Sequence, residues 1–375
     1  MRIGIDVRLI KQSGVGRYIK NLVEHLLTVD KTNSYFLFFR PEDISEFRSK
    51  FQSAKKEILP VKWHGIANQL QTPKILLKYN LDLMHFPYFD APFLYPRKFV
   101  VTIHDLIIDH FPTGKASTLH PLFYLAKFTG YKLVMKKTVA KAARIIVPSR
   151  DTKDELEHHY QSSRGKVSVV YEGVGIIGRQ ISDQILKKIK VRAKNYFLYV
   201  GNAYPHKNLE YLISSFKEFI LKTKNKKYLK LVLVGANDFF YKRLKKFILE
   251  QQISDDVIFT GYAEDSELTA LYRNALSLIF PSKMEGFGLP ILEALANNCP
   301  VLASNIPVFH EIAGDNIYYF NIEEKDALYK LMRKIYEGTF NLSWKTEKAK
   351  ETTLKYSFKK MAEETLKIYE NCSRL

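Results

Sequence analysis

Two carboxylates, Glu285 and Glu293, flank a short glycine loop at residues 286–288. A carboxylate accepts hydrogen bonds and repels phosphate, so this pair suits sugar hydroxyls. The loop glycines let the backbone come close to a ligand. Pro290 favours the first turn of a helix, where N–H groups bind phosphate or other oxygen-rich groups. Each Glu alone has a simpler explanation, since Glu293 can complement the helix dipole in that first turn and Glu285 can be a solvated loop residue.

The residues around this loop predict the elements that hold it. An apolar run at 276–280 has the length of a buried parallel strand. The next helix has apolar residues at 291, 292, 295 and 296, and 299–303 is a second short strand. The order is therefore strand, glycine loop, helix and strand. Ligands of such a unit lie at the carboxyl ends of the strands.

The second half of the chain begins a new pattern of this kind at 196–200. That strand leads through Gly201 and Asn202 to Lys207, at the entrance of a helix. A lysine there is well placed to meet a phosphate, although a surface lysine is the simpler interpretation. Further strands are predicted at 231–235 and 257–262.

The first half also alternates strands with helices, which predicts a parallel, doubly wound sheet. Gly14 and Gly16 follow its first strand and predict a glycine turn, although a lone G-x-G is more often a tight turn than a ligand site. His104, followed by Asp105, stands at the end of a later strand. For His85, also at a strand end, we favour a surface or hydrogen-bonded core residue. The predicted strands are 3–7, 35–39, 83–86, 99–103, 143–147 and 167–170.

Length and composition predict two globular domains, since the chain has 375 residues of which 46% are hydrophobic. We expect no signal peptide, because the chain opens directly into the predicted strand 3–7, which contains the charged Asp6. No window approaches the ~18 apolar residues of a spanning helix. Cys299 and Cys372 are too few for a disulfide framework, which favours a reduced cytoplasmic protein. The net charge of +19 suggests an anionic partner, whether nucleic acid, a phosphate-rich substrate or a membrane surface.

The stretch 111–150 contains no acidic residue. Its apolar residues, among them Phe123, Phe128 and Tyr131, are interleaved with lysines and arginines. The stretch predicts one or two basic amphipathic helices. Two interpretations stay open: an ordinary domain helix with a solvated lysine face, or attachment to an anionic membrane surface.

The segment EGFGLPILEALA, in which seven residues separate Glu285 from Glu293, resembles the signature of glycosyltransferase family 4. That family consists of retaining GT-B enzymes with nucleotide-sugar donors. The likeness covers nearly the whole chain and is strongest from 196 to 320. It implies an α/β GT-B architecture, in which two Rossmann-like doubly wound domains face each other across a cleft. The expected parts are an acceptor-side domain at 1–175, a linker at 176–194, a donor domain at 195–355 and a C-terminal helix at 356–375 that packs back toward the first domain.

The resemblance also implies roles for single residues. Glu293 would accept hydrogen bonds from the ribose hydroxyls and Glu285 from those of the donor sugar, while Lys207 would offset charge on the departing diphosphate. His104 would contact the donor sugar and phosphate, and Asn202 stands where the family usually has an arginine. The expected catalytic residues are His104, Lys207 and Glu285. The expected donor-binding residues are Gly14, Gly16, Asn202, Lys207, Gly261, Tyr262, Glu285, Gly286, Phe287, Gly288, Leu289 and Glu293.

The expected function is retaining transfer of a hexose from a GDP-mannose-like or UDP-sugar donor to a hydroxyl of a glycan or lipid-linked acceptor, in cell-surface polysaccharide synthesis. We expect no cofactor and no metal, because no Asp-x-Asp pair stands at a strand end. The expected location is the cytoplasm or the cytoplasmic membrane face, reached through residues 111–150. A GT-B-shaped nucleotide-sugar epimerase is the first alternative. A nucleic-acid-binding protein is less favoured because no known binding motif appears, and a nicotinamide oxidoreductase because no complete G-x-G-x-x-G follows either first strand.

Overall fold

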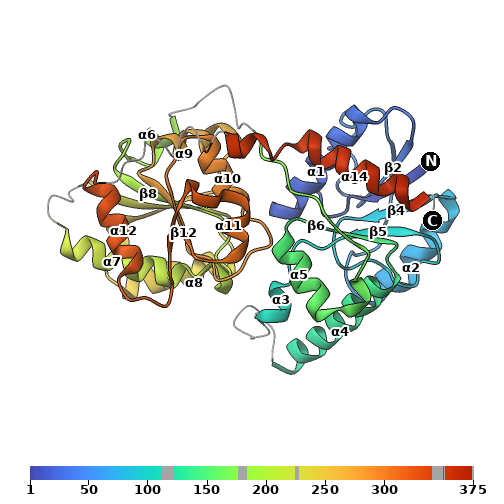
Figure 1. The fold of residues 1–375 in the computed structure, drawn as a ribbon, viewed down its shortest axis with the longest axis horizontal. Coiled ribbons are helices and arrows are strands. Elements are labelled where there is room, and N and C mark those ends of the chain that lie inside the picture. The colour runs from blue at the N-terminus through green and yellow to red at the C-terminus, as the bar shows by residue number, and fades with distance from the viewer. Residues whose placement is uncertain (112–120, 176–183, 224–227, 340–348, 350, 374–375) are drawn as a thin grey trace. The chain divides into compact units, whose positions relative to one another are not determined.

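The computed structural model describes residues 1–111, 121–175, 184–223, 228–339, 349 and 351–373. The chain divides into two compact units (Figure 1). The first unit comprises Met1–Gly173 and Tyr356–Leu375, and the second comprises Val174–Lys355. Each unit is built on a parallel sheet with helices on both faces, so the predicted α/β class is confirmed.

The sheet of the first unit has the strand order β3-β2-β1-β4-β5-β6-β7. Strand β3 of this sheet is not predicted from the sequence, because its residues KKEI are charged and half exposed. A charged strand of this kind is typical of a sheet edge, where charges discourage pairing with other chains. The strands are β1 (Arg2–Asp6), β2 (Ser34–Phe39), β3 (Lys55–Ile58), β4 (Leu83–Phe86), β5 (Phe99–Thr102), β6 (Arg144–Val147) and β7 (Val167–Val169).

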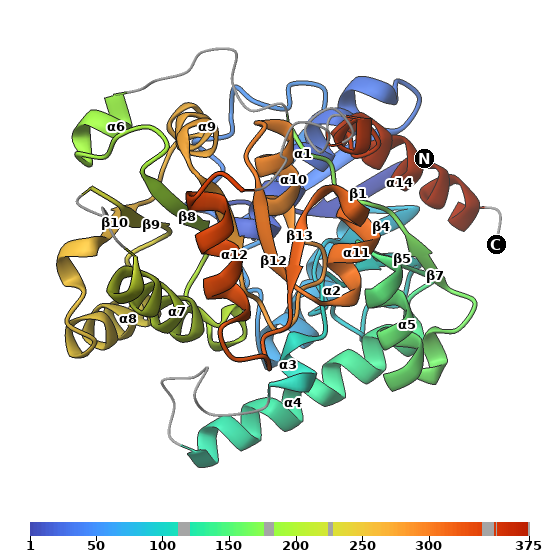
Figure 2. The ribbon, with the colours of Figure 1, turned by 60° about the vertical axis from the view of Figure 1, so that its left-hand side comes forward.

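Helices cover both faces of this sheet. Helices α1 and α14 lie side by side on one face, while α4 and α5 lie on the other (Figures 1 and 2). The C-terminal helix α14 is thus part of the first unit, although 182 residues of the second unit separate it from the preceding strand. The described helices are α1 (Ser13–Val29), α2 (Ile66–Leu76), α3 (Ile107–His110), α4 (Pro121–Lys141), α5 (Arg150–His159) and α14 (Phe358–Ser373).

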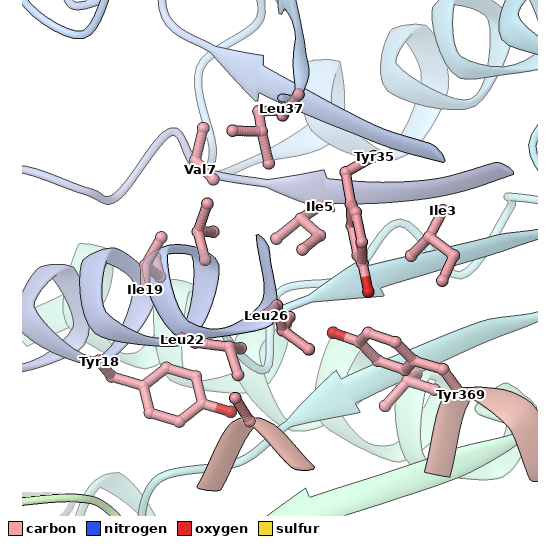
Figure 3. Packing of buried hydrophobic residues seen from close by; sticks show 14 of the residues in the cluster. Ile3, Ile5, Val7, Tyr18, Ile19, Leu22, Leu26, Tyr35, Leu37 and Tyr369 are labelled. Carbon is pink, nitrogen blue, oxygen red and sulfur yellow. The ribbon is translucent and has the colours of Figure 1, made fainter. Parts of the chain in front are cut away.

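The core of the first unit forms between β1, α1 and α14 (Figure 3). Ile3 and Ile5 are two residues apart in β1, so both point to the same face of the sheet, and neither is accessible to solvent. Leu22 and Leu26 of α1 meet them at the one-turn spacing of a helix. Tyr369 completes the cluster from α14 and is fully buried. This packing fixes β1, and therefore the loop at its carboxyl end.

His85 confirms the prediction of a hydrogen-bonded core residue. It is fully buried in β4, with Nδ1 2.6 Å from the Tyr369 hydroxyl and Nε2 2.8 Å from the Thr102 hydroxyl. Burial lowers the pKa of His85 to about 3, so the ring is neutral. Its two bonds tie β4 to β5 and to α14.

The sheet of the second unit has the strand order β10-β9-β8-β11-β12-β13. Helices α7, α8 and α12 (Ala327–Tyr336) cover one face, and α6, α9 and α10 cover the other (Figure 2). The short helix α6 (Gln184–Lys188) lies within the segment that the sequence analysis treats as a linker. The strands are β8 (Tyr196–Val200), β9 (Lys230–Val234), β10 (Val257–Gly261), β11 (Ser277–Phe280), β12 (Val301–Ser304) and β13 (Tyr318–Phe320), and the other helices are α7 (Leu209–Lys222), α8 (Phe239–Glu250), α9 (Asp265–Asn274), α10 (Leu289–Ala296) and α11 (Pro307–Ala313).

Candidate active site

The strand order of the second unit reverses between β8 and β11. From β8 the chain continues to β9 and β10 on one side, and β11, β12 and β13 lie on the other. The loops that leave β8 and β11 therefore diverge, and the crevice between them at the carboxyl ends is the usual ligand position of an open α/β sheet. Lys207 follows β8 and Glu285 follows β11. The fold thus brings together two predicted catalytic residues.

Lys207 and Glu285 form an ion pair. Lys207 Nζ lies 2.5 Å from Glu285 Oε1, and their side chains are 12% and 9% exposed. The hydroxyl of Ser282 donates to the same carboxylate oxygen at 2.6 Å. The sequence analysis misses Ser282, although its place between β11 and the glycine loop is a usable signal. Glu285 thus compensates the charge of Lys207, and the lysine side chain stays partly accessible to solvent.

The glycine loop leads directly into α10. Gly288 adopts φ +111°, a conformation that side chains disfavour, and it precedes the first residue of the helix, Leu289. A Cβ on Gly288 would also lie 3.0 Å from the ring of Phe309. Both constraints explain the glycine. The helix start then presents backbone N–H groups at the position that the sequence analysis predicts for the sugar and phosphate oxygens.

Glu293 differs from the sequence-based expectation in its position. It is the fifth residue of α10 rather than part of the first turn, and it is 1% exposed. Its Oε2 accepts a hydrogen bond of 2.9 Å from the hydroxyl of Tyr272 in α9. The simpler interpretation, in which Glu293 only complements the helix dipole in the first turn, is therefore wrong. A buried, oriented carboxylate costs solvation energy, and such residues are concentrated at functional sites.

Glycines stand at the carboxyl ends of three strands of the second unit: Gly201 follows β8, Gly235 follows β9, and Gly261 is the last residue of β10. The Gly235 N–H donates to the Gly261 carbonyl at 3.1 Å, and a Cβ on Gly235 would lie 2.2 Å from the Gly201 carbonyl. Glycine is needed at Gly235 because the backbones approach so closely. Gly261 has φ +77°, and the next residue, Tyr262, is 81% exposed. The exposed ring at this edge is available to stack on a planar base.

Asn202 and His206 lie in the loop after β8. Asn202 Oδ1 accepts a hydrogen bond of 3.3 Å from the Tyr204 N–H, and its carbonyl accepts one of 2.6 Å from the Tyr199 hydroxyl. Asn202 thus shapes the loop where the family usually has an arginine. Burial, aided by the charge of Lys207, lowers the pKa of His206 to about 4. His206 is therefore neutral at pH 7 and does not replace that charge.

His104 belongs to the first unit, after β5. Its Nδ1 lies 3.2 Å from Glu172 Oε1, and its Nε2 lies 3.0 Å from the Pro87 carbonyl oxygen. Both partners are acceptors, so a ring that carries a proton on each nitrogen satisfies both contacts. Burial opposes this charge, but Glu172 and the Pro87 carbonyl outweigh it and raise the pKa of His104. The rings of Tyr18 and His104 meet edge to face, with centroids 4.8 Å apart, so Tyr18 supports the His104 ring from one side.

Glu172 is a second residue that the sequence analysis misses. It follows β7, at the same carboxyl edge of the sheet as His104, and it is 8% exposed. The available signal is a lone carboxylate between the end of a strand and Gly173. Ligands and catalytic residues are expected at the carboxyl edge of a parallel sheet, so a charged residue there is a candidate.

Gly14 and Gly16 correct the prediction of a glycine turn. Helix α1 begins at Ser13, so both glycines lie in its first turn. A Cβ on Gly16 would lie 2.4 Å from the Ile10 carbonyl oxygen, whereas one on Gly14 would meet nothing within 4 Å. Gly16 is thus required for the close return of the chain after β1, and Gly14 leaves open space at the helix start.

The basic stretch 111–150 coincides in large part with α4, while residues 112–120 lie outside the described chain. Leu125 and Leu133 are 60% and 53% exposed, whereas Met135 and Val139 are buried. Lys132 pairs with Asp109 at 3.0 Å. In the described part of the chain, none of the helices combines the length and apolar character needed to cross a membrane.

Comparisons with known proteins identify the family of the chain. The family described as "Glycosyltransferase Family 4" matches residues 12–176, and "Glycosyl transferases group 1" matches residues 182–353. The O-antigen chain mannosyltransferase RfbU of Salmonella typhimurium (strain LT2) is 28% identical over 284 residues, which cover 76% of this chain and 73% of the relative. The O-antigen chain mannosyltransferase B of Escherichia coli is 24% identical over 337 residues, which cover 84% and 85%.

Solved structures share the architecture. The sucrose-phosphate synthase from Thermosynechococcus elongatus superposes with a TM-score of 0.77 and 18% identity, covering 99% of this chain and 98% of the synthase. Anabaena Alr3699/HepE in complex with UDP-glucose superposes with a TM-score of 0.76 and 16% identity, covering all of both chains. The protein is a GT-B glycosyltransferase, and the chain belongs to the group 1 and family 4 glycosyltransferases.

Proposed function

We propose that the enzyme transfers a hexose, with retention, from a nucleotide-diphosphate sugar to a hydroxyl of a glycan or lipid-linked acceptor. The observation that carries this proposal is the contact between Lys207 and Glu285 at the β8–β11 switch point. One group is a cation suited to a diphosphate, and the other accepts hydrogen bonds from sugar hydroxyls. A nucleotide-diphosphate sugar carries both partners, since its diphosphate is linked directly to the hydroxyl-bearing sugar.

The nature of the relatives supports mannose as the transferred sugar. Two of them, from Salmonella typhimurium and Escherichia coli, are named O-antigen chain mannosyltransferases. We therefore propose a GDP-mannose-like donor and a role in cell-surface polysaccharide synthesis. The named complex of Anabaena HepE with UDP-glucose makes UDP-sugars the second class to test.

The ion pair suggests how the diphosphate leaves. Before the donor binds, Glu285 compensates the charge of Lys207. On binding, Lys207 moves its contact to a diphosphate oxygen, and Glu285 accepts from hydroxyls of the sugar. As the acceptor hydroxyl oxygen bonds to C1 of the sugar and the bond between the sugar and the diphosphate breaks, negative charge grows on the leaving group, and a diphosphate oxygen takes up the hydroxyl proton. Lys207 and the N–H groups at the start of α10 then stabilise that charge.

Glu293 and His104 complete the proposed machinery. Tyr272 orients the buried carboxylate of Glu293, which accepts hydrogen bonds from the ribose hydroxyls. The imidazolium of His104 adds a positive charge at the reacting end, where it acts on the donor sugar and phosphate. Glu172 keeps that charge in place and is a positioning residue.

A screen of nucleotide sugars tests the proposal. The unfolding temperature is measured with GDP-mannose, UDP-glucose and ADP-glucose, each compared with its free nucleoside diphosphate. We expect one donor to stabilise the protein, by about 2.7 kcal/mol when present at 100 times its Kd. Nucleoside diphosphate release with a polysaccharide acceptor extract then reports turnover. Absence of both stabilisation and release with all three donors contradicts the proposal.

We also propose that α4 holds the enzyme at an anionic membrane surface. Its exposed residues combine apolar side chains, Leu125 and Leu133, with the charges of Lys127, Lys136 and Lys137. Each lysine near an anionic leaflet contributes about 1 kcal/mol, and the attraction is screened by salt. This location would bring the enzyme to a lipid-linked acceptor.

Vesicle sedimentation tests the membrane proposal. We expect the protein to sediment with phosphatidylglycerol vesicles at low salt and to be released by high salt. The double variant Lys136→Glu/Lys137→Glu should remain in the supernatant. The matched control, Lys74→Glu/Lys78→Glu, changes two exposed lysines of the same unit outside α4. Equal sedimentation of the two double variants contradicts the role of α4.

A further inference from the structure

The first unit has its own switch point, between β1 and β4. A pocket lies there, outside the carboxyl ends of these two strands. Its walls include Asp6 and Arg8 from the end of β1, and Pro87 and Tyr88 from the end of β4. Trp63 and Asp90 close it from neighbouring loops. None of these residues belongs to the predicted donor site, so the pocket needs its own explanation.

A buried ion pair forms one wall of the pocket. Arg8 is nearly inaccessible, with a 1% exposed side chain, and its guanidinium lies 2.5 Å from Asp6 Oδ2. The guanidinium also donates to the Val61 carbonyl at 2.8 Å and to Asn68 Oδ1 at 3.0 Å. A buried ion pair is weak evidence for stability, because desolvation offsets the attraction. Its evident result is an Asp6 carboxylate that is fixed in orientation and, at 12%, more exposed than its partner.

Asp90 is a second oriented carboxylate of the pocket. Its Oδ1 accepts a hydrogen bond of 3.1 Å from Gln69, and its Oδ2 lies 2.6 Å from His64 Nδ1. A carboxylate accepts, so Nδ1 carries a proton, and in the neutral ring Nε2 is an acceptor. The His64 side chain is 43% exposed. This edge of the pocket therefore offers acceptors to a ligand that donates, as hydroxyl groups do.

Aromatic rings supply the apolar part of the pocket. The rings of Trp63 and Tyr88 meet edge to face, with centroids 5.9 Å apart and planes at 75°. The His64 ring packs against the Trp63 ring, with centroids 3.5 Å apart. A flat, partly exposed indole suits the C–H face of a pyranose, whose hydroxyls point outward toward polar partners.

The pocket adjoins His104. Pro87, one of its wall residues, accepts a hydrogen bond of 3.0 Å from His104 Nε2. The cation in the wall, Arg8, is already engaged by three acceptor groups. The chemistry therefore favours a neutral, hydroxyl-rich ligand over a phosphate.

We propose that this pocket binds one pyranose unit of the glycan acceptor. Trp63 stacks on the apolar face of the sugar, and Asp6 and Asp90 accept hydrogen bonds from its hydroxyls. The inference rests on the proposed function, since it assigns the acceptor of that reaction to named residues. It also places the acceptor beside His104, the residue proposed to act at the reacting end.

Tryptophan fluorescence provides the test, because the sequence contains two tryptophans, Trp63 and Trp344. In a Trp344→Phe background, Trp63 is the sole reporter. Methyl α-D-mannopyranoside and α-linked mannose oligosaccharides are titrated, with sorbitol as a polyol that has hydroxyls but no pyranose ring. We expect a saturable change with the glycosides and none with sorbitol. Asp90→Asn should weaken binding about tenfold or more, the effect of losing one charge-assisted hydrogen bond.

Two further variants keep the test decisive. Asp82→Asn changes an exposed carboxylate outside the pocket, which accepts from the Arg2 N–H, and should bind as the parent does. Trp63→Ala, followed by saturation-transfer NMR of the glycoside, should lose binding and raise the acceptor KM more than it lowers kcat. Unchanged binding in folded Asp90→Asn and Trp63→Ala overturns the proposal, as does a parent that binds no glycoside.

Donor binding separates this outcome from failure of the proposed function. The unfolding-temperature shift with nucleotide sugars is recorded for the same variants. If glycosides do not bind but a nucleotide sugar does, the pocket assignment is wrong and the transferase proposal stands. If glycosides bind to the pocket but no nucleotide sugar binds, the pocket is a glycan site and the proposed donor reaction is wrong.

Discussion

The two units have the same kind of sheet but different chemistry at their switch points. At β8–β11, Lys207 pairs with Glu285 across two loops, and both side chains are about one-tenth exposed. At β1–β4, Arg8 pairs with Asp6 two residues away, and the guanidinium is almost completely buried. In the proposed mechanism the first cation exchanges its partner for a diphosphate, whereas the second is held by surrounding acceptors. The common topology sets where a ligand lies, and the side chains set which ligand it is.

The helices that begin at these switch points differ as well. In the second unit, Gly288 directly precedes α10 and has a left-handed conformation. In the first unit, Gly14 and Gly16 lie inside α1, and Gly16 is needed for contact with the returning chain. Gly288 serves the left-handed turn into α10, and Gly16 serves packing. The following four changes test this contrast, in order of decreasing expected effect.

Lys207→Ala should produce the largest effect. Loss of a charge that stabilises the leaving diphosphate should lower kcat by about 10²–10³, and binding of the nucleoside diphosphate should weaken more than binding of the monophosphate. Glu285→Gln should lower turnover but retain nucleotide binding. Lys207→Ala leaves Glu285 uncompensated and should lower the unfolding temperature. The double variant Lys207→Ala/Glu285→Gln should regain the unfolding temperature but not turnover, which separates the effect on stability from the effect on catalysis. Equal loss of affinity for both nucleotides would show that Lys207 does not contact the diphosphate.

Glu293→Gln should weaken nucleotide binding. The neutral amide loses charge-assisted acceptance from ribose hydroxyls, at a cost of about 1.5–3 kcal/mol per bond. The amide oxygen can still accept from Tyr272, so the unfolding temperature should change little. Isothermal titration with the nucleoside diphosphate measures the effect. Unchanged affinity would disprove the ribose contact, and Tyr272→Phe serves as the control for orientation alone.

Gly16→Ala should destabilise the first unit by about 1–3 kcal/mol, because its Cβ would overlap the Ile10 carbonyl. Gly14→Ala is the matched control two residues earlier in the same turn. It meets open space, and alanine is the better helix former by up to about 1 kcal/mol, so stability should hold or rise. Urea unfolding of both variants measures the difference. Similar destabilisation by both would contradict the packing role of Gly16.

Glu172→Gln should change the pH dependence without removing a contact to substrate. The pKa of His104 is raised in the folded protein, so its stabilising contribution is complete below the unfolded pKa of about 6.5 and is lost as pH rises through the folded value. Removal of the carboxylate should lower the folded pKa and move the alkaline limb of kcat to lower pH. NMR titration of His104 measures this directly. An unchanged His104 pKa would show that Glu172 does not hold the proton.

Much of the fold was predictable because its signals are local. Apolar runs predict most of the strands, and the strand at 276–280, the glycine loop and the helix start at Pro290 are read from consecutive residues. The edge strand β3 escapes prediction because its residues are charged, and pairing with β2 stabilises it. The first turn of α1 escapes because glycine is a poor helix former, and contact with Ile10 overrides that propensity.

Residue types and spacing alone determined that His104 follows a strand, that Glu285 and Glu293 flank a glycine loop, and that Lys207 stands at a helix entrance. Only the tertiary structure decided which of these residues have partners, and which partners they have. Lys207 meets Glu285 across 78 positions, and His104 meets Glu172 across 68. The pocket of the first unit likewise joins the ends of β1 and β4 with Trp63 and Asp90. The physical reason is that strand order in a parallel sheet is set by packing of the whole unit, and carboxyl ends that are distant in the chain become neighbours only once that order exists.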